Sequence, residues 1–503
     1  MANEPLRVAT VFSGIGAFEH ALMRMEIPHE IVFACDTGEI NIFQKKFPKG
    51  AACIPVELKV IREMVDAIRQ DGAEEEYLKD LEHAYQQVQE LYRNYLDDPE
   101  SDADSWHRRR TKDIKERMGM IYEKIRVHDI KKHLKTLPME ERKPYIDSLY
   151  ENGKRVNYVR ESYLANYDLD PKDFYWDINF LDGKPYRGQI DIFVGGSPCQ
   201  SFSMAGKRRG LEDTRGTLFY QYARLIKEIQ PKVFIYENVR ALLNHDHGKT
   251  WEIMQSVFKE LGYDWHAKVL NAKDYGIPQS RNRLYVVGIR RDLALAEPFQ
   301  FPEPVPLPCK MQDFLMDNVS GRYYLPPKGA RFVTNKRNVE KRFTQVGGDI
   351  ALCQVKNQQS NWIGDFVFVE ENHDMEKTME DLEKYFLSPR CLRTVMGTGT
   401  KTYHVEPEID MDVAHTLLAT MHKMHRAGID NYVTTRGRIR RLTPRECLRL
   451  MGFCDSFKIV VSDTEMYHQT GNSIVVDVLI AILNRVFLSL PSLVVQEGKE
   501  ASA

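Results

Sequence analysis

The pattern that most limits the possible folds lies near the start of the chain, within residues 6–34. An apolar run at 6–12 predicts a buried strand, and the glycine-rich residues 13–16 predict a tight turn. Helical spacing over 18–25 and a second apolar run at 31–34 follow. A strand, a glycine turn, a helix and a strand in this order are typical of the opening of a doubly wound parallel sheet.

Three later apolar runs predict further strands of the same sheet, at 190–194, 233–236 and 283–289. Helical spacing over 219–229 and 250–261 lies between them. Strands that alternate with helices favour a sheet with helices on both faces. The sequence therefore predicts an α/β fold of the Rossmann-like kind.

Two changes in composition interrupt this alternation. The chain is charged and helical between the second and third predicted strands, and five prolines within 298–308 predict a stiff, extended connector. Periodicity is weak after the connector and helical again from Arg440. We predict a main α/β domain (1–50, 176–300 and 436–503), a charged helical insertion (51–175) and a smaller, loop-rich domain (301–435).

The insertion has two halves of opposite charge. Residues 57–97 contain five basic and eleven acidic side chains, whereas 107–143 contain thirteen basic and six acidic ones. The simpler interpretation is that two solvated helical faces attract each other. The alternative is that the basic half, including 108–110, extends a contact with nucleic acid.

Composition excludes several classes of protein. A net charge of -2 over 503 residues excludes a uniformly basic nucleic-acid binder, although it allows local basic faces. The eight cysteines form no Cys-x-x-Cys pair, so we expect a reducing, cytoplasmic compartment and no structural metal. The apolar stretch 474–490 contains Asp477 and Arg485, and the N-terminus has no signal pattern, so we expect no membrane partner.

Ligand-binding residue types follow the first two predicted strands. Phe12, Gly14 and Gly16 lie in the first turn, where glycines let the backbone approach a ligand. Asp36 ends the second strand, where an acid binds ribose hydroxyls in nucleotide-type sites. The third glycine of the dinucleotide fingerprint is absent, which argues against a nicotinamide enzyme. A turn required only for packing is the alternative.

Reactive side chains also follow the later strands. Cys199 lies on a Gly/Pro-rich loop after 190–194, a typical position for a nucleophile, although a lone cysteine is more often core packing. Glu237 ends the next strand and could reach the same crevice, or be a surface acid. Arg281 and Arg283 occupy alternate positions, so we expect them to share a face and to suit a phosphate or a base edge.

In this order, the motifs resemble the cytosine-C5 DNA methyltransferase family of the bacterial or phage restriction–modification type. The resemblance covers roughly 1–50, 177–300 and 436–490. The chain departs from compact members in its long insertion and in Ala205, where a serine is common. The matching motifs are Phe-x-Gly-x-Gly at 12–16, Pro-Cys-Gln at 198–200, Asp-Thr-Arg-Gly-Thr-Leu at 213–218, Glu-Asn-Val at 237–239, Gln-x-Arg-x-Arg at 279–283, the segment 444–453 and Gly-Asn-Ser at 471–473.

The resemblance implies methyl transfer from S-adenosyl-L-methionine to C5 of a flipped-out cytosine, with S-adenosyl-L-homocysteine as product. It implies that Cys199 adds to C6 of the base, that Glu237 binds N3 and N4, and that Arg283 holds O2 beside Arg281. The cofactor residues that it implies are Phe12, Gly14, Ile15, Gly16, Asp36, Asp177, Ile178, Pro198, Leu218, Asn472 and Ser473.

The resemblance also makes 301–435 the target-recognition domain for double-stranded DNA. A basic cluster at 421–445 suits phosphates, and His422 and His425 are better explained as part of it than as a metal site. The residues expected at the DNA are Gln200, Ser203, Thr416, Arg436, Arg438 and Arg441.

Three other functions remain as alternatives. A tRNA cytosine-C5 methyltransferase is disfavoured by the large 301–435 domain. An inactive DNA-binding relative is disfavoured by the intact residues Cys199, Glu237, Arg281 and Arg283. A nicotinamide dehydrogenase is more distant. We expect a monomer that acts on DNA in the bacterial cytoplasm, whether or not a separate cognate restriction endonuclease exists.

Overall fold

The computed structural model describes the chain in several stretches, and the following statements concern those residues alone: 4–97, 104–153, 155–198, 218–316, 323, 325, 327–356, 358–368, 399–400, 403–404, 439–441 and 443–494. The chain forms two compact units, each described by itself. The first unit contains 1–277, 281–307 and 451–503, and the second contains 278–280 and 308–450.

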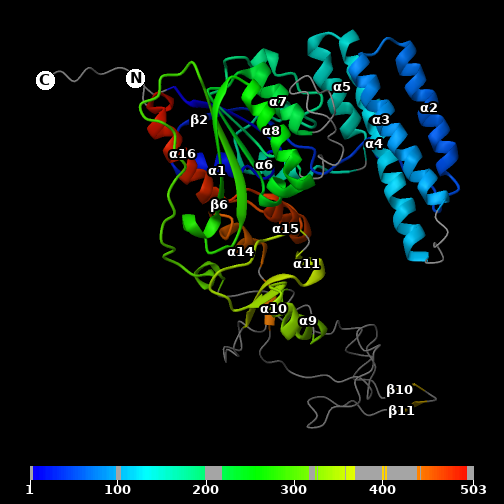
Figure 1. Ribbon diagram of the computed structural model, residues 1–503. Helices are drawn as coiled ribbons and strands as arrows, with labels where there is room; N and C mark the ends of the chain where they lie inside the picture. The colour runs from blue at the N-terminus through cyan, green and yellow to red at the C-terminus, as the bar shows by residue number, and fades with distance from the viewer. Residues whose placement is uncertain are drawn as a thin grey trace. The chain divides into compact units, whose positions relative to one another are not determined.

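A seven-stranded sheet forms the centre of the first unit (Figure 1). The strand order is β3-β2-β1-β4-β5-β7-β6, and all neighbours are parallel except at β7, which runs antiparallel to β5 and β6. The strands are β1 (Leu6–Val11), β2 (His29–Cys35), β3 (Phe174–Tyr175), β4 (Ile192–Gly195), β5 (Val233–Val239), β6 (Tyr263–Asn271) and β7 (Asn282–Arg290). The Rossmann-like sheet predicted from sequence is confirmed.

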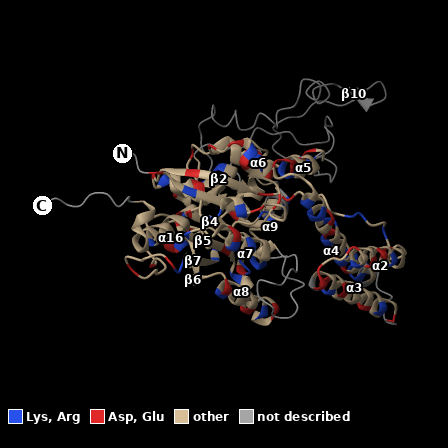
Figure 2. Ribbon diagram, turned by 90° about the horizontal axis from the view of Figure 1, so that it is seen from above, with Lys and Arg blue, Asp and Glu red and all other residues tan. Residues whose placement is uncertain are grey.

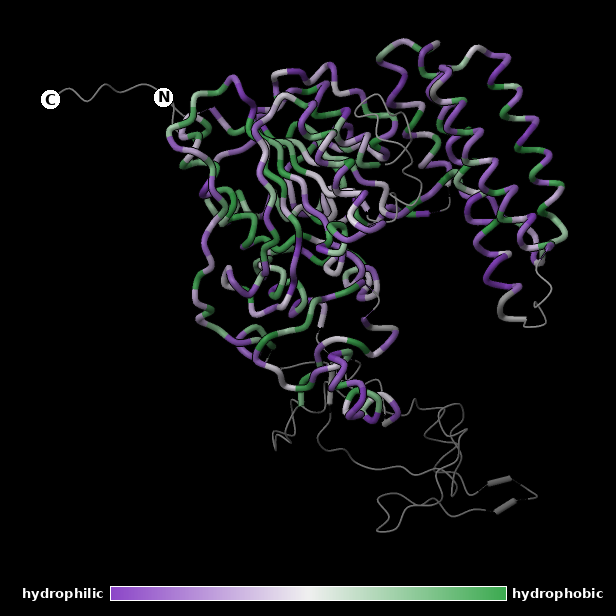
Figure 3. Tube along the Cα trace, viewed as in Figure 1, coloured by the Kyte–Doolittle hydropathy of each residue, from purple (hydrophilic) through white to green (hydrophobic). Residues whose placement is uncertain are grey.

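Helices cover both faces of this sheet, as predicted. In Figure 1, α1 (Ala17–Arg24) and α16 (Val476–Ser489) lie on one face, and α7 (Leu218–Ile229) and α8 (Lys249–Glu260) lie on the other. Because both faces are covered, β4 is buried along its whole length, and Figure 3 shows hydrophobic residues concentrated in the sheet. Two further helices complete the core region: α6 (Tyr158–Asn166) and α15 (Asp463–Asn472).

Strand β6 has no counterpart among the predicted strands. Its middle residues are largely exposed, because it is the edge strand of the sheet and is joined to the buried β7 as an antiparallel pair. An edge strand that carries Asp264, His266 and Lys268 lacks the apolar run by which a strand is recognised.

The segment between β2 and α6 forms a helical insertion, whose helices are α2 (Ile54–Gln70), α3 (Glu75–Leu96), α4 (Asp104–Thr136) and α5 (Met139–Glu151). Helices α2, α3 and α4 share an apolar core that includes Ile61, Leu81 and Met118. Figure 2 shows the basic and acidic residues distributed over these helices. Lys124 of α4 forms an ion pair with Asp80 of α3 at 2.5 Å, and Lys132 of α4 pairs with Asp71 at 2.8 Å, so ion pairs link the two oppositely charged halves.

Elements that pack on the seven-stranded sheet begin inside the segment predicted as the insertion, 51–175. Helix α6 hydrogen-bonds to α1 through Tyr163 and Glu19, and β3 pairs with β2. The elements that pack on the sheet therefore start near residue 157.

The second unit is small and contains the three-stranded sheet β12-β9-β8. Its core includes Val333 and Phe366, and the side chain of Thr443 caps the first turn of the helix that ends it. The strands are β8 (Thr344–Val346), β9 (Gly364–Phe368) and β12 (Ile439–Arg441), with a separate pair β10 (Gly399–Thr400) and β11 (Tyr403–His404); the helices are α9 (Pro327–Val333), α10 (Lys336–Glu340), α11 (Gln358–Asn361) and α14 (Pro444–Arg449).

One stretch of the described residues, Asp463–Ser489, is long and apolar enough to cross a membrane by length and composition alone. It comprises α15 and α16, and 56% of its most apolar window is buried inside the protein. Its apolarity is that of a core helix.

Candidate active site

The strand order itself defines where a ligand can bind. The order reverses between β1 and β4, and sheets of this kind bind ligands beyond the carboxyl ends of the strands at such a point. The segments 12–16, 36–39 and 196–198 follow β1, β2 and β4, and 177–178 follow β3. The sequence motifs thus lie on neighbouring loops at one edge of the sheet.

The loop after β1 has an unusual backbone. Phe12, Gly14 and Gly16 all have positive φ, at 53°, 55° and 74°. A Cβ on Gly16 would clash with the ring of Tyr167, whose hydroxyl donates to the carbonyls of Ile15 and Gly16 at 3.0 and 2.7 Å. A Cβ on Gly14, by contrast, would meet no atom within 4 Å. One side of the loop is therefore packed and the other faces open space.

Asp36 joins this loop to the next one. Its two carboxylate oxygens accept hydrogen bonds from the backbone N–H groups of Gly14 (2.9 Å) and Gly38 (2.8 Å). Burial raises the pKa of Asp36, and these two hydrogen bonds oppose the rise. Each oxygen keeps a further lone pair for a ligand hydroxyl.

Four further predicted cofactor residues make the following contacts. The Asn472 amide donates to Glu39, three residues after Asp36, at 3.1 Å. Ser473 is buried, and its carbonyl accepts from Arg281. The Ile178 carbonyl accepts from the guanidinium of Arg224, while Leu218 begins α7 and packs against the main core.

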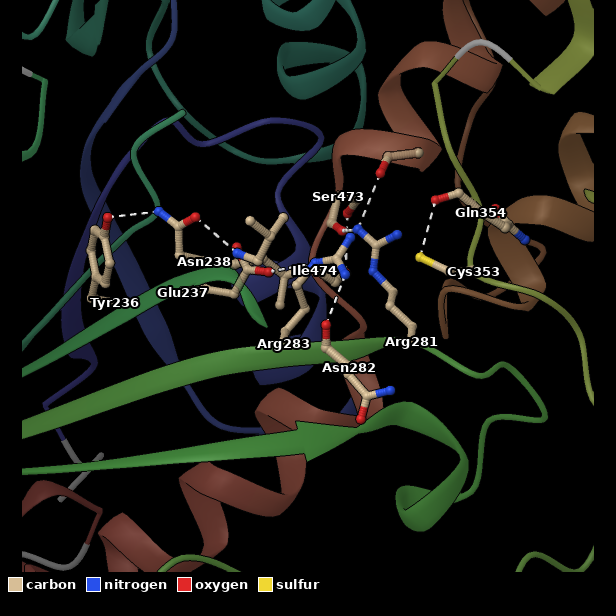
Figure 4. Close-up of polar contacts among 12 residues, drawn as sticks. Tyr236, Glu237, Asn238, Arg281, Asn282, Arg283, Cys353, Gln354, Ser473 and Ile474 are labelled. Carbon is tan, nitrogen blue, oxygen red and sulfur yellow. Dashed lines mark hydrogen bonds and ion pairs between the residues drawn. The ribbon is translucent and has the colours of Figure 1, made fainter. Parts of the chain in front are cut away.

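Glu237 and Arg283 form the central ion pair. Glu237 of β5 lies opposite Tyr285 of β7 in the strand register. Arg283 is two residues from Tyr285 on β7, so it is a diagonal neighbour of Glu237 on the same face of the sheet. Arg283 Nε lies 3.2 Å from Glu237 Oε1, and the two side chains are 16% and 14% exposed (Figure 4). Burial raises the pKa of Glu237, while Arg283 and Arg281 lower it.

The loop after β4 approaches this pair closely. A Cβ on Gly196 would lie 2.7 Å from the Glu237 carbonyl, so glycine is required at this position. Asn238 donates to the Ser197 carbonyl at 2.9 Å and to the Tyr236 hydroxyl at 2.8 Å. These contacts fix the backbone of the loop against the end of β5, directly before Pro198.

Arg281 directly precedes β7 and has different hydrogen-bond partners from Arg283. Its guanidinium donates to the carbonyls of Gly471 (3.1 Å) and Ser473 (2.7 Å), as Figure 4 shows for Ser473. In Figure 4 the side chains of Arg281 and Arg283 extend to the same side of the strand and Asn282 extends to the other, as expected from their alternate positions.

Several predicted site residues lie outside the described residues: Cys199, Gln200, Ser203, Thr416, Arg436 and Arg438. Arg441 lies in β12, and its side chain is not described. Among the described residues, no group of three or more His, Cys, Asp or Glu side chains could hold a metal ion.

Side chains that are distant in the sequence support the loops and were not among the predicted site residues. Tyr167 holds the loop after β1, and Asn157 donates to the Asp36 carbonyl at 2.9 Å. Both lie about 120 to 150 residues from their partners. Asn157 gives one local signal, since it caps α6 by accepting from the Arg160 N–H. Nothing local indicates the contact of either side chain with the loops.

Comparison with known proteins defines the family. The model of the C-5 cytosine-specific DNA methylase family matches residues 136–488. The chain is 33% identical over 326 residues to the Type II methyltransferase M.HhaI of Haemophilus parahaemolyticus. This match covers 64% of this chain and 82% of that protein. It is 31% identical over 344 residues to the Type II methyltransferase M.HpaII of Haemophilus parainfluenzae, covering 67% and 82%.

A phage protein is similar to the same degree. The orphan methyltransferase M.SPRI of Bacillus phage SPR is 31% identical over 396 residues, covering 65% of this chain and 88% of that protein. With these matches, the fold and the loops described above identify a methyltransferase of the C-5 cytosine-specific DNA methylase family, to which the chain belongs. It is a DNA (cytosine-5) methyltransferase, and S-adenosylmethionine is the methyl donor that the family implies.

Proposed function

We propose that this protein methylates C5 of a flipped-out cytosine in a specific double-stranded DNA sequence through a covalent bond between Cys199 and C6. The observation that carries the proposal is the pair of Glu237 and Arg283 beside Gly196, three residues before Cys199. A base held by these two side chains would lie next to the loop that continues into Pro198 and Cys199.

The reaction needs a nucleophile because cytosine C5 is itself unreactive. Attack of the Cys199 thiolate forms the S–C6 bond, and the electrons of the C5–C6 double bond make C5 nucleophilic. After C5 is methylated, a base removes the C5 proton, the double bond re-forms and Cys199 leaves as the thiolate. Nothing in the described residues assigns this base to one side chain.

Glu237 and Arg283 would bind and activate the base. A neutral Glu237 carboxyl donates to cytosine N3 and accepts from the N4 amino group, whereas Arg283 donates to O2. Burial favours this neutral form, because it raises the pKa of Glu237. Thymine presents an N–H at position 3 and a carbonyl at position 4, so it would not fit the same donor and acceptor.

The described loops fit the cofactor. The open space beside Gly14 admits a ligand against the backbone, and Asp36 has lone pairs for ribose hydroxyls. S-adenosyl-L-methionine supplies an electrophilic methyl group carried on a sulfonium. The residues that we propose hold it are Phe12, Gly14, Ile15, Gly16, Asp36, Asp177, Ile178, Pro198, Leu218, Asn472 and Ser473.

We assign DNA recognition to the second unit, 278–280 and 308–450. The target atom is unreachable inside a duplex, so the base must be extruded at a cost of about a few kcal/mol. Contacts to phosphates would position the protein, and we propose that Gln200, Ser203, Thr416, Arg436, Arg438 and Arg441 contribute at the DNA. We further propose a monomer that acts in the cytoplasm, with or without a separate restriction endonuclease.

Duplexes that contain 5-fluorocytosine test the covalent step. Fluorine at C5 cannot leave as a cation, so elimination stops and the Cys199–C6 bond persists after methylation. We expect a denaturation-resistant complex with DNA that forms only with the cofactor and disappears in Cys199→Ala.

A complex that survives in Cys199→Ala would contradict the assigned nucleophile. Trapping on a fluorinated tRNA and not on duplex DNA would favour the tRNA methyltransferase alternative.

A further inference from the structure

The helical insertion reaches the cofactor loops as well as forming its own bundle. An apolar cluster joins α4 and α5 to the residues that follow β2 and β3, and its buried members are Ile40, Leu134, Ile146, Tyr150 and Trp176. In addition, the Asn41 amide donates to Glu123 of α4 at 3.0 Å. The insertion therefore packs on the two loops that carry Asp36 and Asp177.

Tyr150 of α5 makes the most direct contact. Its ring is 1% exposed and stacks on Trp176, with ring centroids 5.3 Å apart. Its hydroxyl donates to Asp177 Oδ2 at 2.7 Å, while Asp177 Oδ1 accepts from the backbone and amide nitrogens of Asn179. These bonds fix the carboxylate plane and leave a second lone pair on Oδ2.

An ionised Asp177 would need stabilisation in this buried position. Burial raises its pKa, and the hydrogen bonds from Asn179 and Tyr150, together with the positive charge of Lys131, oppose the rise. Lys131 of α4 lines a hollow of about 390 Å³ with Asp177, and burial lowers the pKa of Lys131 to about 8. The other ionisable groups that act on this cluster are Glu123 and Lys135 of α4, Cys35 of β2, and Arg224 and Glu228 of α7.

We infer that Tyr150 and Lys131 are positioning residues, by which the insertion keeps the Asp177 carboxylate ionised and oriented to accept from the adenine amino group of the cofactor. The inference rests on the proposed role of Asp177. The insertion then supports one side of the cofactor site. Its removal would weaken cofactor binding even in the absence of DNA.

Calorimetric binding of S-adenosyl-L-homocysteine between pH 5 and 8 tests this inference without relying on turnover. Tyr150→Phe keeps the stacked ring and removes only the hydroxyl. Since a hydrogen bond to a charged group is lost, we expect the Kd to rise about tenfold or more at pH 7. Lys131→Met should raise the Kd in the same direction.

The pH profile separates positioning from simple packing. Without the hydroxyl or the ammonium, the pKa of Asp177 rises further, so cofactor affinity should fall at a higher pH than in the parent protein as the solution is acidified. Tyr145→Phe is the matched control, because Tyr145 lies in the same helix and packs edge-on against His133 at 4.8 Å. We expect it to leave both the Kd and the profile unchanged.

Asp177→Asn distinguishes a failure of the inference about Tyr150 and Lys131 from a failure of the proposed role of Asp177. If it weakens binding while Tyr150→Phe and Lys131→Met bind as the parent protein does, the inference is overturned and the proposed site stands. If Asp177→Asn itself leaves the Kd unchanged, the assignment of Asp177 fails, and the inference fails with it. If Tyr150→Phe lowers the melting temperature, the pH profile of cofactor affinity in Lys131→Met tests the inference instead.

Discussion

The protonation state of a single carboxyl, that of Glu237, sets the pH range of the proposed reaction. Burial raises its pKa above the ordinary value of 4.5, so the neutral form persists to a higher pH than on an exposed glutamate. Between 4.5 and the raised value, the folded state binds more protons than the unfolded state, and stability falls as pH rises. The kcat/KM for methylation should likewise decline as pH rises through the raised pKa.

Glu237→Gln tests this assignment. The amide can form the same two hydrogen bonds with cytosine but cannot release a proton to N3, so we expect kcat to fall about 100-fold or more with little change in DNA affinity. The variant should also lose the decline in kcat/KM with pH. Glu252→Gln, an exposed acid on α8, is the control. Activity of Glu237→Gln within about threefold of the parent protein would rule out proton donation by this residue.

At the scale of elements, the loop between β1 and α1 depends on the backbone freedom of Gly16. Gly16→Ala places a Cβ at φ 74° and against the Tyr167 ring, whereas Gly188→Ala places one at φ 71° in open space. The left-handed backbone costs about 1–2 kcal/mol in both variants, and overlap adds about 1–3 kcal/mol in the first. Thermal unfolding should therefore show a larger decrease in stability for Gly16→Ala than for Gly188→Ala. Gly16→Ala should also bind the cofactor more weakly. Equal losses in the two variants would mean that Tyr167 does not restrict the loop.

The elements also show which parts of the fold local sequence can predict. The buried strands β1, β4 and β5 are continuous apolar runs bounded by turns, so they and the ligand residues at their ends could be identified. Edge strand β6 has no such run, and β3 contains only two residues. Tyr150 and Asn157 act on Asp177 and Asp36 through tertiary contacts that no spacing encodes.

At the scale of the whole molecule, DNA affinity should depend on salt through a few arginines. The sequence assigns Arg436 and Arg438 to phosphates, although both lie outside the described residues. Arg438→Ala should weaken binding to all duplexes about equally and reduce the slope of log K against log salt by about 1. Lys172→Ala is the control, since Lys172 pairs with Asp170 at 3.0 Å. A loss confined to one DNA sequence would instead indicate that Arg438 contacts a base.

The central claim, that the whole protein methylates cytosine C5 in DNA through Cys199, is tested most directly in cells. The protein and its Cys199→Ala variant would each be expressed in a methylation-deficient bacterium, and the genomic DNA sequenced after bisulfite conversion. Our account predicts protected cytosines in one short sequence context with the parent protein and none with the variant. Soluble, folded parent protein that leaves every cytosine unprotected, or protection that persists in Cys199→Ala, would contradict it.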